Sequence, residues 1–405
     1  MKKILIISQY YYPDTFKINE ISQSLANKGY EIDIVTGLPD YTSGTIPKEF
    51  KNLKKRDELI GNVRVHRVPT MARKKGAIHR IFNYLSFAIN GSIYVKFSSK
   101  KYDHIFVYQL SPVTMILPAI VAKKKYKKPL IVYCLDIWPE SVKAMGFKES
   151  SQIFAFISKL SKKIYSKVDK FAVSSNAFID YMTRVDDVPK EKLVYLPQHS
   201  EYMKTTTLGS TENILRKKEN VKNYIFTGNV GMVQDLETIV NAVSLSKLKK
   251  HYIVHIVGDG TNLIKIKKLA TDMELDNVIF YGRLPYDKMA RVLHESDACL
   301  LTLKHDNEIG LTIPTKLQTY MAVGKPILAA IDGDARDIIK EANCGIATNS
   351  GNAQGLADIF DSVASNRIDI KSFEQNAKDY FNKNFTEEIF INKLMKIMEE
   401  THYER

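Results

Sequence analysis

The chain has 405 residues, which is too long for one ordinary domain, and its hydrophobic content of 44% is enough for two cores. Its formal net charge is +14. Its three cysteines lie far apart without metal-ligand or CxxC spacing, which argues against a disulfide framework or a zinc site. The basic excess would attract nucleic acid, an anionic membrane or a phosphorylated ligand, and composition alone does not choose among them.

The first half of the chain alternates short β-branched runs with helical patterns, as repeated βαβ units do. Between the first two runs, Ile18–Lys28 is predicted to be a helix that ends at Gly29. The apolar run after Met1 is too short for a signal peptide, and we expect no transmembrane segment. The predicted strands are Lys3–Ile7, Glu31–Thr36, Val63–Val68, His104–Tyr108, Leu130–Cys134, Lys170–Val173 and Leu193–Leu196.

The alternation stops after Pro197 and restarts near Asn223, so residues 198–222 are predicted to be a surface linker. The sequence from Ser372 onward predicts helix, and we expect the helix at about 385–405 to cross back to the first domain. The strands predicted in this half are Tyr224–Thr227, Ile253–Val257, Val278–Tyr281, Ala298–Leu303, Ile327–Ala330 and Gly345–Ala347.

The predicted fold class is therefore α/β, with two facing doubly wound, Rossmann-like parallel sheets. The first domain spans residues 1–197 and the second spans residues 223–384. Open sheets of this kind bind ligands at the carboxyl ends of their strands, so we expect the functional cleft between the two domains.

Two segments of the second half carry the chemistry of an anion site. Gly228 and Gly231 follow a predicted strand and precede a helix, where free amides and the helix dipole favour a diphosphate. Further on, Pro314 suits the first turn of a helix that Thr312 would cap, and Lys316 lies in that turn. A cation at a helix start interacts unfavourably with the helix dipole, and a nearby anion would offset this cost. Lys316 is therefore a candidate ligand of a phosphate group.

These segments resemble the donor domain of family 4 glycosyltransferases with the GT-B fold. The resemblance rests on the loop from Gly228 to Gly231, on Val257-Gly258-Asp259-Gly260, on Phe280-Tyr281-Gly282-Arg283-Leu284-Pro285, and on the run from Pro314-Thr315-Lys316 to Gly324-Lys325-Pro326. In the first half, the segments 10–20, 36–41 and 136–141 resemble the branch that includes WbuB-type enzymes of O-antigen and capsule assembly. The match spans nearly the whole chain in the expected order.

The resemblance implies transfer of a sugar with retention of configuration from a nucleotide sugar, usually a UDP-sugar, without a required metal. Asp332-Gly333-Asp334 has the spacing of a metal-binding DxD motif, but its place after a late strand favours a turn. We therefore expect no metal site and no cofactor beyond the nucleotide-sugar substrate.

The sequence departs from the family pattern at positions that hold the donor. The family often has Arg and Lys where this chain has Asn229 and Gln234, so the cationic role passes to Lys316 or, second, to Arg283. Thr319 and Leu311 stand where relatives have two glutamates. Their roles then fall to Asp306 or Glu308 for the sugar, and to Thr319 or Gln318 for the ribose.

In the first domain, Asp136 follows the fifth predicted strand, where many relatives place a histidine near the reacting carbon. It could orient the acceptor, act as a base, or stabilise positive charge. The catalytic candidates are thus Asp136 and Glu308. The full set of predicted donor-binding residues is Phe16, Lys17, Asn19, Gly228, Asn229, Gly231, Gln234, Gly258, Arg283, Asp306, Leu311, Thr312, Pro314, Thr315, Lys316 and Thr319.

Most of the basic excess lies in the first half, where residues 1–200 hold 33 Lys and Arg against 17 Asp and Glu. Within it, segment 77–100 repeats large apolar residues at helical spacing beside Arg and Lys, as helices on anionic membranes do. A helix packed on the sheet with a solvated basic rim fits the same spacing. The apolar positions are Ile78, Ile81, Phe82, Leu85, Ile89, Ile93 and Phe97.

The sequence therefore predicts a cytoplasmic glycosyltransferase, peripheral on the inner face of the membrane. Its expected donor is a UDP-sugar carrying an N-acetylated amino sugar or a deoxy sugar. Its expected acceptor is a polyprenyl-diphosphate-linked or other saccharide. The alternatives are a sugar-nucleotide epimerase of the same fold and a basic nucleic-acid-binding protein, although the lysine runs lack the interleaved aromatics that stack on bases.

Overall fold

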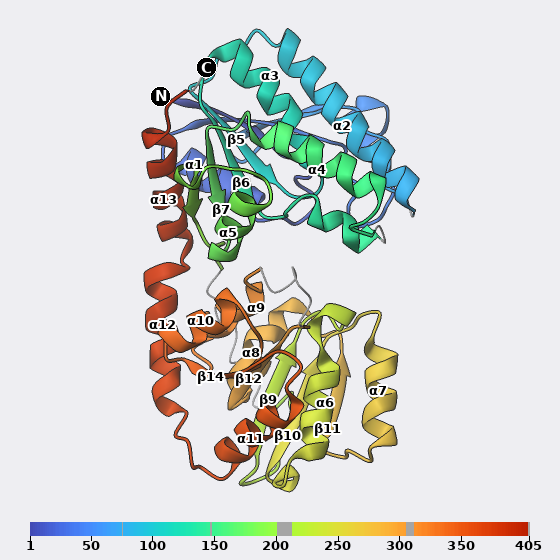
Figure 1. Ribbon diagram of the computed structural model, residues 1–405, viewed down its shortest axis with the longest axis vertical. Coiled ribbons are helices and arrows are strands. Elements are labelled where there is room, and N and C mark those ends of the chain that lie inside the picture. The colour runs from blue at the N-terminus through green and yellow to red at the C-terminus, as the bar shows by residue number, and fades with distance from the viewer. Residues whose placement is uncertain (75, 146–147, 201–212, 305–311, 404–405) are drawn as a thin grey trace. The chain divides into compact units, whose positions relative to one another are not determined.

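The computed structural model describes residues 1–74, 76–145, 148–200, 213–304 and 312–403, which divide into two compact units (Figure 1). One unit comprises Met1–Leu196 together with the segment that begins at Ile391, and the other comprises Pro197–Phe390. The cleft expected between the two units stays a prediction.

In the first unit, the described residues form an eight-stranded sheet in the order β3-β4-β2-β1-β5-β6-β7-β8. The strand order reverses between β1 and β5, which makes that point the expected ligand site of a doubly wound sheet. All paired strands are parallel except β3, which is antiparallel to β4. The strands are β1 (Lys3–Ile7), β2 (Glu31–Thr36), β3 (Asp57–Ile60), β4 (Val63–Arg67), β5 (His104–Gln109), β6 (Leu130–Cys134), β7 (Lys170–Val173) and β8 (Leu193–Tyr195).

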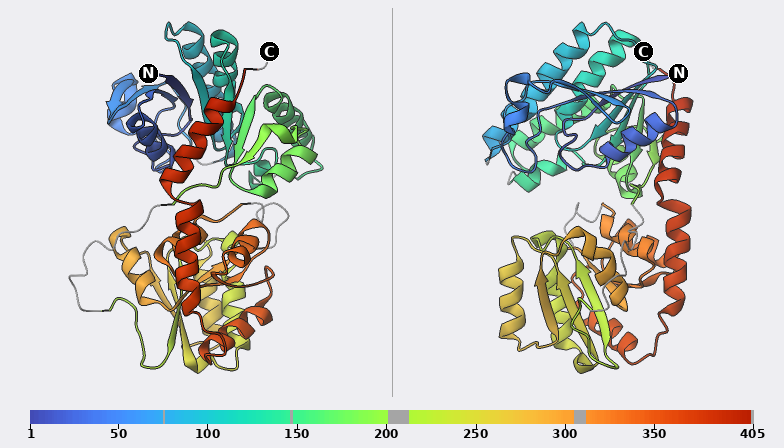
Figure 2. Two further views of the ribbon diagram at one scale, coloured as in Figure 1. Left: turned by 90° about the vertical axis from the view of Figure 1, so that its left-hand side faces the viewer. Right: turned by 180° about the vertical axis from the view of Figure 1, so that it is seen from behind.

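Helices cover this sheet through buried apolar side chains. In α1, Ile18, Ile21 and Leu25 are spaced by three and four residues and are buried. The helices α2 and α3 pack against each other, and both views of Figure 2 show them side by side. The helices of this unit are α1 (Ile18–Asn27), α2 (Ala77–Phe97), α3 (Leu117–Tyr126), α4 (Gln152–Tyr165), α5 (Asn176–Arg184) and, from Ile391 on, α13 (Glu387–Glu400).

The second unit contains a six-stranded parallel sheet in the order β11-β10-β9-β12-β13-β14, whose order reverses between β9 and β12. Its strands are β9 (Lys222–Thr227), β10 (Tyr252–Val257), β11 (Val278–Gly282), β12 (Ala298–Thr302), β13 (Ile327–Ala330) and β14 (Gly345–Thr348). Its helices are α6 (Leu236–Leu245), α7 (Leu263–Asp272), α8 (Met289–Glu295), α9 (Thr315–Val323), α10 (Asp334–Glu341), α11 (Ala353–Ala364) and α12 (Lys371–Asn384).

Two apolar layers hold the second sheet between its helices. Side chains such as Ile239 of α6 and Leu356 of α11 are buried on one face. Leu317 of α9 and Phe381 of α12 are buried on the other face. This arrangement, with helices on both sides of a parallel sheet, is the doubly wound fold that the alternating sequence pattern predicts.

The structure departs from the expected elements in two places. The strand β3 was not predicted, because its sequence Asp-Glu-Leu-Ile is short and charged and it lies at the sheet edge. Part of the predicted linker also packs in the second unit: Leu215 is buried, and its backbone N–H donates to Glu295 at 2.9 Å.

The helix α2 exposes the apolar residues that its spacing singled out. Each of the seven is at least 44% exposed, whereas Phe87 and Val95 on the opposite side are buried. The interpretation that the seven side chains pack on the sheet is therefore wrong. We call this exposed set the α2 stripe: Ile78, Ile81, Phe82, Leu85, Ile89, Ile93 and Phe97. In the part of the chain that the structure describes, no helix is long and apolar enough to cross a membrane.

Candidate functional site

Glycines bring two turns of the second unit together at the carboxyl ends of β9 and β10. The N–H of Gly228 donates to Val257 O at 2.9 Å, and the N–H of Val230 donates to Asp259 O at 2.9 Å. Gly258 has a φ of +152°, and a Cβ there would lie 1.7 Å from Gly228 O. Only glycine allows this approach of two backbones, so Gly258 is required for the turns to meet.

The two family-divergent polar residues of the first turn bond to each other. Gln234 Oε1 accepts from Asn229 Nδ2 at 3.2 Å and from the N–H of Gly231 at 3.1 Å. The pair thus fixes the loop that runs from Gly228 to the helix start. Neither side chain supplies a cation, which leaves that role to another residue.

Lys316, in the first turn of α9, packs directly on the Gly228 turn. A Cβ on Gly228 would lie 2.7 Å from Lys316 Cε, and Lys316 Nζ lies 3.8 Å from the centre of the Phe226 ring. Burial lowers the pKa of Lys316 to about 7, and no carboxylate pairs with it among the described residues. A desolvated ammonium beside backbone amides is an arrangement that a diphosphate would stabilise.

The start of α9 differs in detail from its prediction. Pro314 lies just before the helix rather than in its first turn, so Thr312, two residues earlier, does not cap it. Thr315 is exposed, and the Thr319 hydroxyl donates to Thr315 O at 3.1 Å. Gln318 is buried, with its Nε2 donating to Gln198 O at 2.6 Å. The family-divergent Thr319 thus bonds its own helix.

The remaining predicted donor residues of this unit fall into two groups. Arg283 is exposed in the turn after β11, one residue beyond Gly282, whose carbonyl accepts from the Gly258 N–H. The candidates Asp306, Glu308 and Leu311 lie outside the described residues, so their roles stay predictions.

In the first unit, Asp136 is held by two hydroxyl groups. Ser111, which follows β5, and Ser141, in the turn after β6, each donate to one of its carboxylate oxygens. Burial raises the pKa of Asp136, and these hydrogen bonds oppose that rise. Trp138, two residues further on, is buried, and its Nε1 donates to Ser111 Oγ at 3.1 Å.

The predicted residues of the loop after β1 take different roles. Phe16 stacks with Tyr10 at 5.7 Å and meets Tyr41 at 4.8 Å between ring centres. Lys17 Nζ forms an ion pair with Glu20 of α1 at 2.8 Å, so its charge is partly neutralised. Asn19 donates to Asp14 O at 2.8 Å, and its Oδ1 is buried without a hydrogen-bond partner in the described chain.

Sequence reasoning missed a charged cluster beside this loop. The Arg73 guanidinium lies 4.4 Å from the centre of the Tyr41 ring and 5.8 Å from that of Tyr10. Asp40 accepts from the Arg73 N–H and from Asn83 Nδ2, each at 2.8 Å, and burial raises its pKa to about 6. Nothing in the sequence joins these residues except that Tyr10 and Asp40 follow adjacent strands.

No group of three or more His, Cys, Asp or Glu side chains in the described ranges could hold a metal ion. The Asp332-Gly333-Asp334 segment forms a turn, in which Gly333 has a φ of +68° and Asp334 begins α10. Asp332 lies 3.7 Å from Arg336 in this turn.

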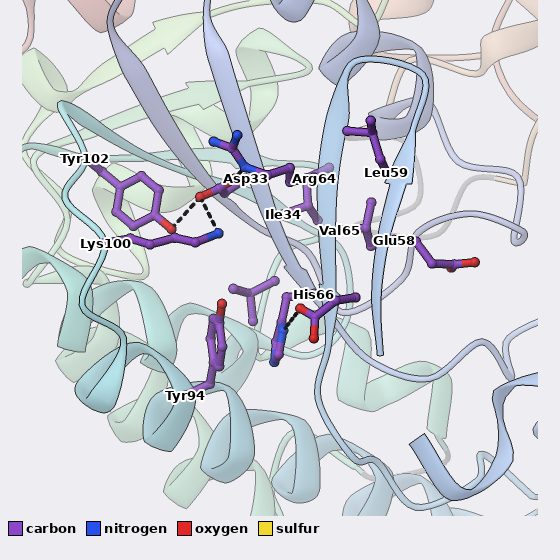
Figure 3. Close-up of a pocket in the computed structure, with 12 residues that line it drawn as sticks. Asp33, Ile34, Glu58, Leu59, Arg64, Val65, His66, Tyr94, Lys100 and Tyr102 are labelled. Carbon is purple, nitrogen blue, oxygen red and sulfur yellow. Dashed lines mark hydrogen bonds and ion pairs between the residues drawn. The ribbon is translucent and has the colours of Figure 1, made fainter. Parts of the chain in front are cut away.

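A separate pocket of about 400 Å³ lies at the β2–β4–β3 edge of the first sheet (Figure 3). Its charged groups pair with one another: Asp33 accepts from Lys100 Nζ at 3.0 Å and from the Tyr102 hydroxyl at 2.8 Å, while His66 pairs with Asp57. These pairs stabilise the sheet edge, so we assign the pocket a structural role.

Comparison with known families agrees with the two-unit architecture. A model of the glycosyl transferase 4-like domain matches residues 17–199, and a model of glycosyl transferases group 1 matches residues 210–380. These matches define a glycosyltransferase. The chain belongs to the family 4-like glycosyltransferases with the GT-B fold, and both the predicted family and the predicted fold class are confirmed.

Individual relatives and solved structures agree with this family and fold. The probable glycosyltransferase WbjE of Pseudomonas aeruginosa is 26% identical over 69% of this chain and 70% of its own. WcaI of Escherichia coli K12, assigned to colanic acid biosynthesis, is 22% identical over 80% of this chain and 81% of its own. Two solved structures share the fold: Thermosynechococcus elongatus sucrose-phosphate synthase (15% identity, TM-score 0.75, 99% of both chains) and Anabaena HepE with UDP (14% identity, TM-score 0.71, 98% and 100%).

Proposed function

We propose that this glycosyltransferase moves a sugar from a UDP-sugar to a lipid-linked saccharide in surface polysaccharide biosynthesis, with retention of anomeric configuration and without a required metal. The donor sugar is expected to be an N-acetylated amino sugar or a deoxy sugar. The assignment of WcaI to colanic acid biosynthesis, together with the structure of a lipopolysaccharide galactosyltransferase among the fold neighbours, supports the polysaccharide role.

One observation carries the donor half of the proposal: the desolvated Lys316 ammonium packed on the Gly228 turn. Transfer breaks the bond between the anomeric carbon and the diphosphate, so negative charge develops on the leaving group. Backbone amides at a helix start and a preorganised ammonium stabilise that charge. UDP as the nucleotide is supported by Anabaena HepE, which was solved with UDP and with UDP-glucose.

Asp136 is the proposed reactive residue of the first unit. As the new bond forms between the acceptor oxygen and the anomeric carbon, the acceptor hydroxyl must lose its proton. A carboxylate whose pKa is raised by burial is a stronger base than a solvated one and can orient that hydroxyl. Ser111 and Ser141 would hold the carboxylate in position for this role.

The α2 stripe supports a peripheral position on the inner face of the membrane. Seven exposed apolar side chains lie on one helix that also carries Arg80 and Lys96, and such a combination binds anionic bilayers. An acceptor anchored in that bilayer would then be within reach of the enzyme.

A panel of nucleotide sugars, screened first by thermal shift and then by transfer to saccharide acceptors, tests the proposal. We expect UDP-sugars to raise the melting temperature more than GDP- or dTDP-sugars, because a ligand bound only by the folded state stabilises it according to its affinity. Stabilisation by a guanine nucleotide alone would contradict the UDP assignment. An inverted product configuration, seen by NMR, would contradict retention.

A further inference from the structure

An apolar groove of about 480 Å³ lies on the first unit between α2, α4 and the turn at Val113–Ile116. Ile81 and Leu85 of α2 line one wall, and Ile153 and Phe156 of α4 line the other. Phe156 is 68% exposed, so apolar surface is open to a partner here. The volume falls within the range of ligand pockets, about 300–1,000 Å³.

The groove reaches the residues around Asp136. Tyr84 and Trp138 both line it, and their rings meet edge to face at 6.5 Å between centres. Trp138 Nε1 donates to the Ser111 hydroxyl, which in turn donates to Asp136. A molecule lying in the groove therefore has one end beside the proposed reactive carboxylate.

Two arginines stand at this end of the groove. Both Arg73 and Arg80 place positive charge near the Tyr84 hydroxyl. Neither arginine forms an ion pair with a carboxylate within the described ranges. Half-buried guanidinium groups without a carboxylate partner suit a phosphate ligand, because their fork of donors matches its oxygens.

We propose that the groove holds the isoprenoid chain of a lipid-linked acceptor, with the acceptor diphosphate at Arg73 and Arg80 and its first sugar beside Asp136. This inference rests on the proposed function and names the acceptor subsite. Ile81 and Leu85 belong to both the groove and the α2 stripe, so the chain can pass from the bilayer into the groove over continuous apolar surface.

Calorimetric titration with farnesyl diphosphate tests the subsite on the full chain, with farnesol and inorganic pyrophosphate as part-ligands. We expect each part-ligand to bind at least tenfold more weakly, because each lacks one of the two contacts. Trp138 lines the groove and is the only tryptophan of the protein, so its emission should shift when the isoprenoid chain contacts its ring. Absence of farnesyl diphosphate binding or of the emission shift would overturn the proposal.

Matched variants separate this groove from general membrane binding. Phe156→Ser and Arg73→Gln should each weaken farnesyl diphosphate binding about tenfold. The Arg73→Gln variant should bind farnesyl diphosphate no more tightly than it binds farnesol. Ile93 is exposed on α2 outside the groove, so Ile93→Ser should leave the affinity for farnesyl diphosphate unchanged. Equal losses in all three variants would overturn the subsite.

Two further measurements keep the outcomes distinct. Sedimentation that shows a dimer dissociated by Phe156→Ser would mean that a second copy occupies the groove, and would also overturn the proposal. UDP binding is measured in the same samples. Normal UDP binding without farnesyl diphosphate binding removes only the acceptor subsite, whereas loss of both would count against the proposed function itself.

Discussion

The carboxyl ends of the two sheets carry different chemistry on the same framework. In the second unit, turns after β9 and β10 meet through glycines, and the half-buried Lys316 ammonium packs against them. In the first unit, the turns after β5 and β6 place a buried carboxylate among hydroxyl groups, and an aromatic cluster with Arg73 follows β1 and β2.

This difference indicates how a doubly wound fold divides the work of group transfer. The glycine turns let the backbone of two strand ends approach closely and place the Lys316 ammonium beside them, an arrangement that we propose serves an anion. Buried carboxylates and aromatic rings suit hydroxyl groups and sugar faces, because they accept hydrogen bonds and offer flat apolar surface. The changes below test whether the two regions act separately.

Asp136→Asn should have the largest effect, lowering the rate of transfer by about 10²- to 10⁴-fold, the usual contribution of a positioned acid or base. Donor affinity, measured by calorimetry with UDP, should change little because the change lies in the first unit. Asp180→Asn, at an exposed position of α5, is the matched control. Turnover equal to wild type in Asp136→Asn would make the carboxylate only structural.

Lys316→Ala should weaken UDP binding by about 10- to 100-fold, since a charge-assisted contact contributes about 1.5–3 kcal/mol. The binding constant from calorimetry measures this loss. Lys340→Ala, an exposed lysine of α10, should bind UDP as wild type does. An unchanged affinity in Lys316→Ala would remove this residue from the donor site and weaken the contrast between the units.

A double variant with Ile89→Ser and Ile93→Ser should bind anionic vesicles about tenfold more weakly, or weaker still. Each large apolar side chain contributes about 1.5–3 kcal/mol to binding when it is fully buried. Vesicle co-sedimentation measures the loss. Solution turnover with a water-soluble acceptor should stay unchanged. Vesicle binding that is unaffected would mean that the α2 stripe does not contact lipid.

The pH dependence of UDP binding should give the smallest effect. The pKa of Lys316 is lowered to about 7, so in the free protein its ammonium form dominates below pH 7 and is lost above it. Affinity should therefore fall by about fivefold as pH rises from 7 to 8, because the ammonium fraction falls from about one half to about one tenth. The slope from calorimetric titrations should be reduced in Lys316→Ala, and a slope unchanged by that substitution would assign it to another group.

The strands were predictable from sequence because parallel strands buried on both faces are continuous apolar runs, as in Ile4–Ile7 and Leu130–Cys134. The strand β3 was not, because it is exposed and its pairing depends on β4. Lys316 was predictable as an anion ligand from its place at a helix start. Its contact with Gly228, 88 positions earlier in the numbering, depends on the strand order that brings β9 next to β12.

The first unit shows a second limit of the sequence. Asp136 was identified through its position after a strand, but its partner Ser111 follows a different strand, and no spacing rule connects the two. No sequence pattern marks Arg73, yet it packs on Tyr10 and Tyr41 from segments that are distant in sequence. Such clusters arise from the parallel packing of strand ends, which local patterns do not encode.

Hydrogen–deuterium exchange with and without UDP tests the central claim most directly, because it shows which backbone amides the nucleotide protects. We predict protection in the turns at Gly228–Gly231 and Gly258–Gly260 and at the start of α9, and we predict that Lys316→Ala reduces it. Protection confined to the strand ends of the first unit, at a UDP concentration that saturates binding, would contradict the assignment of the donor to the second unit.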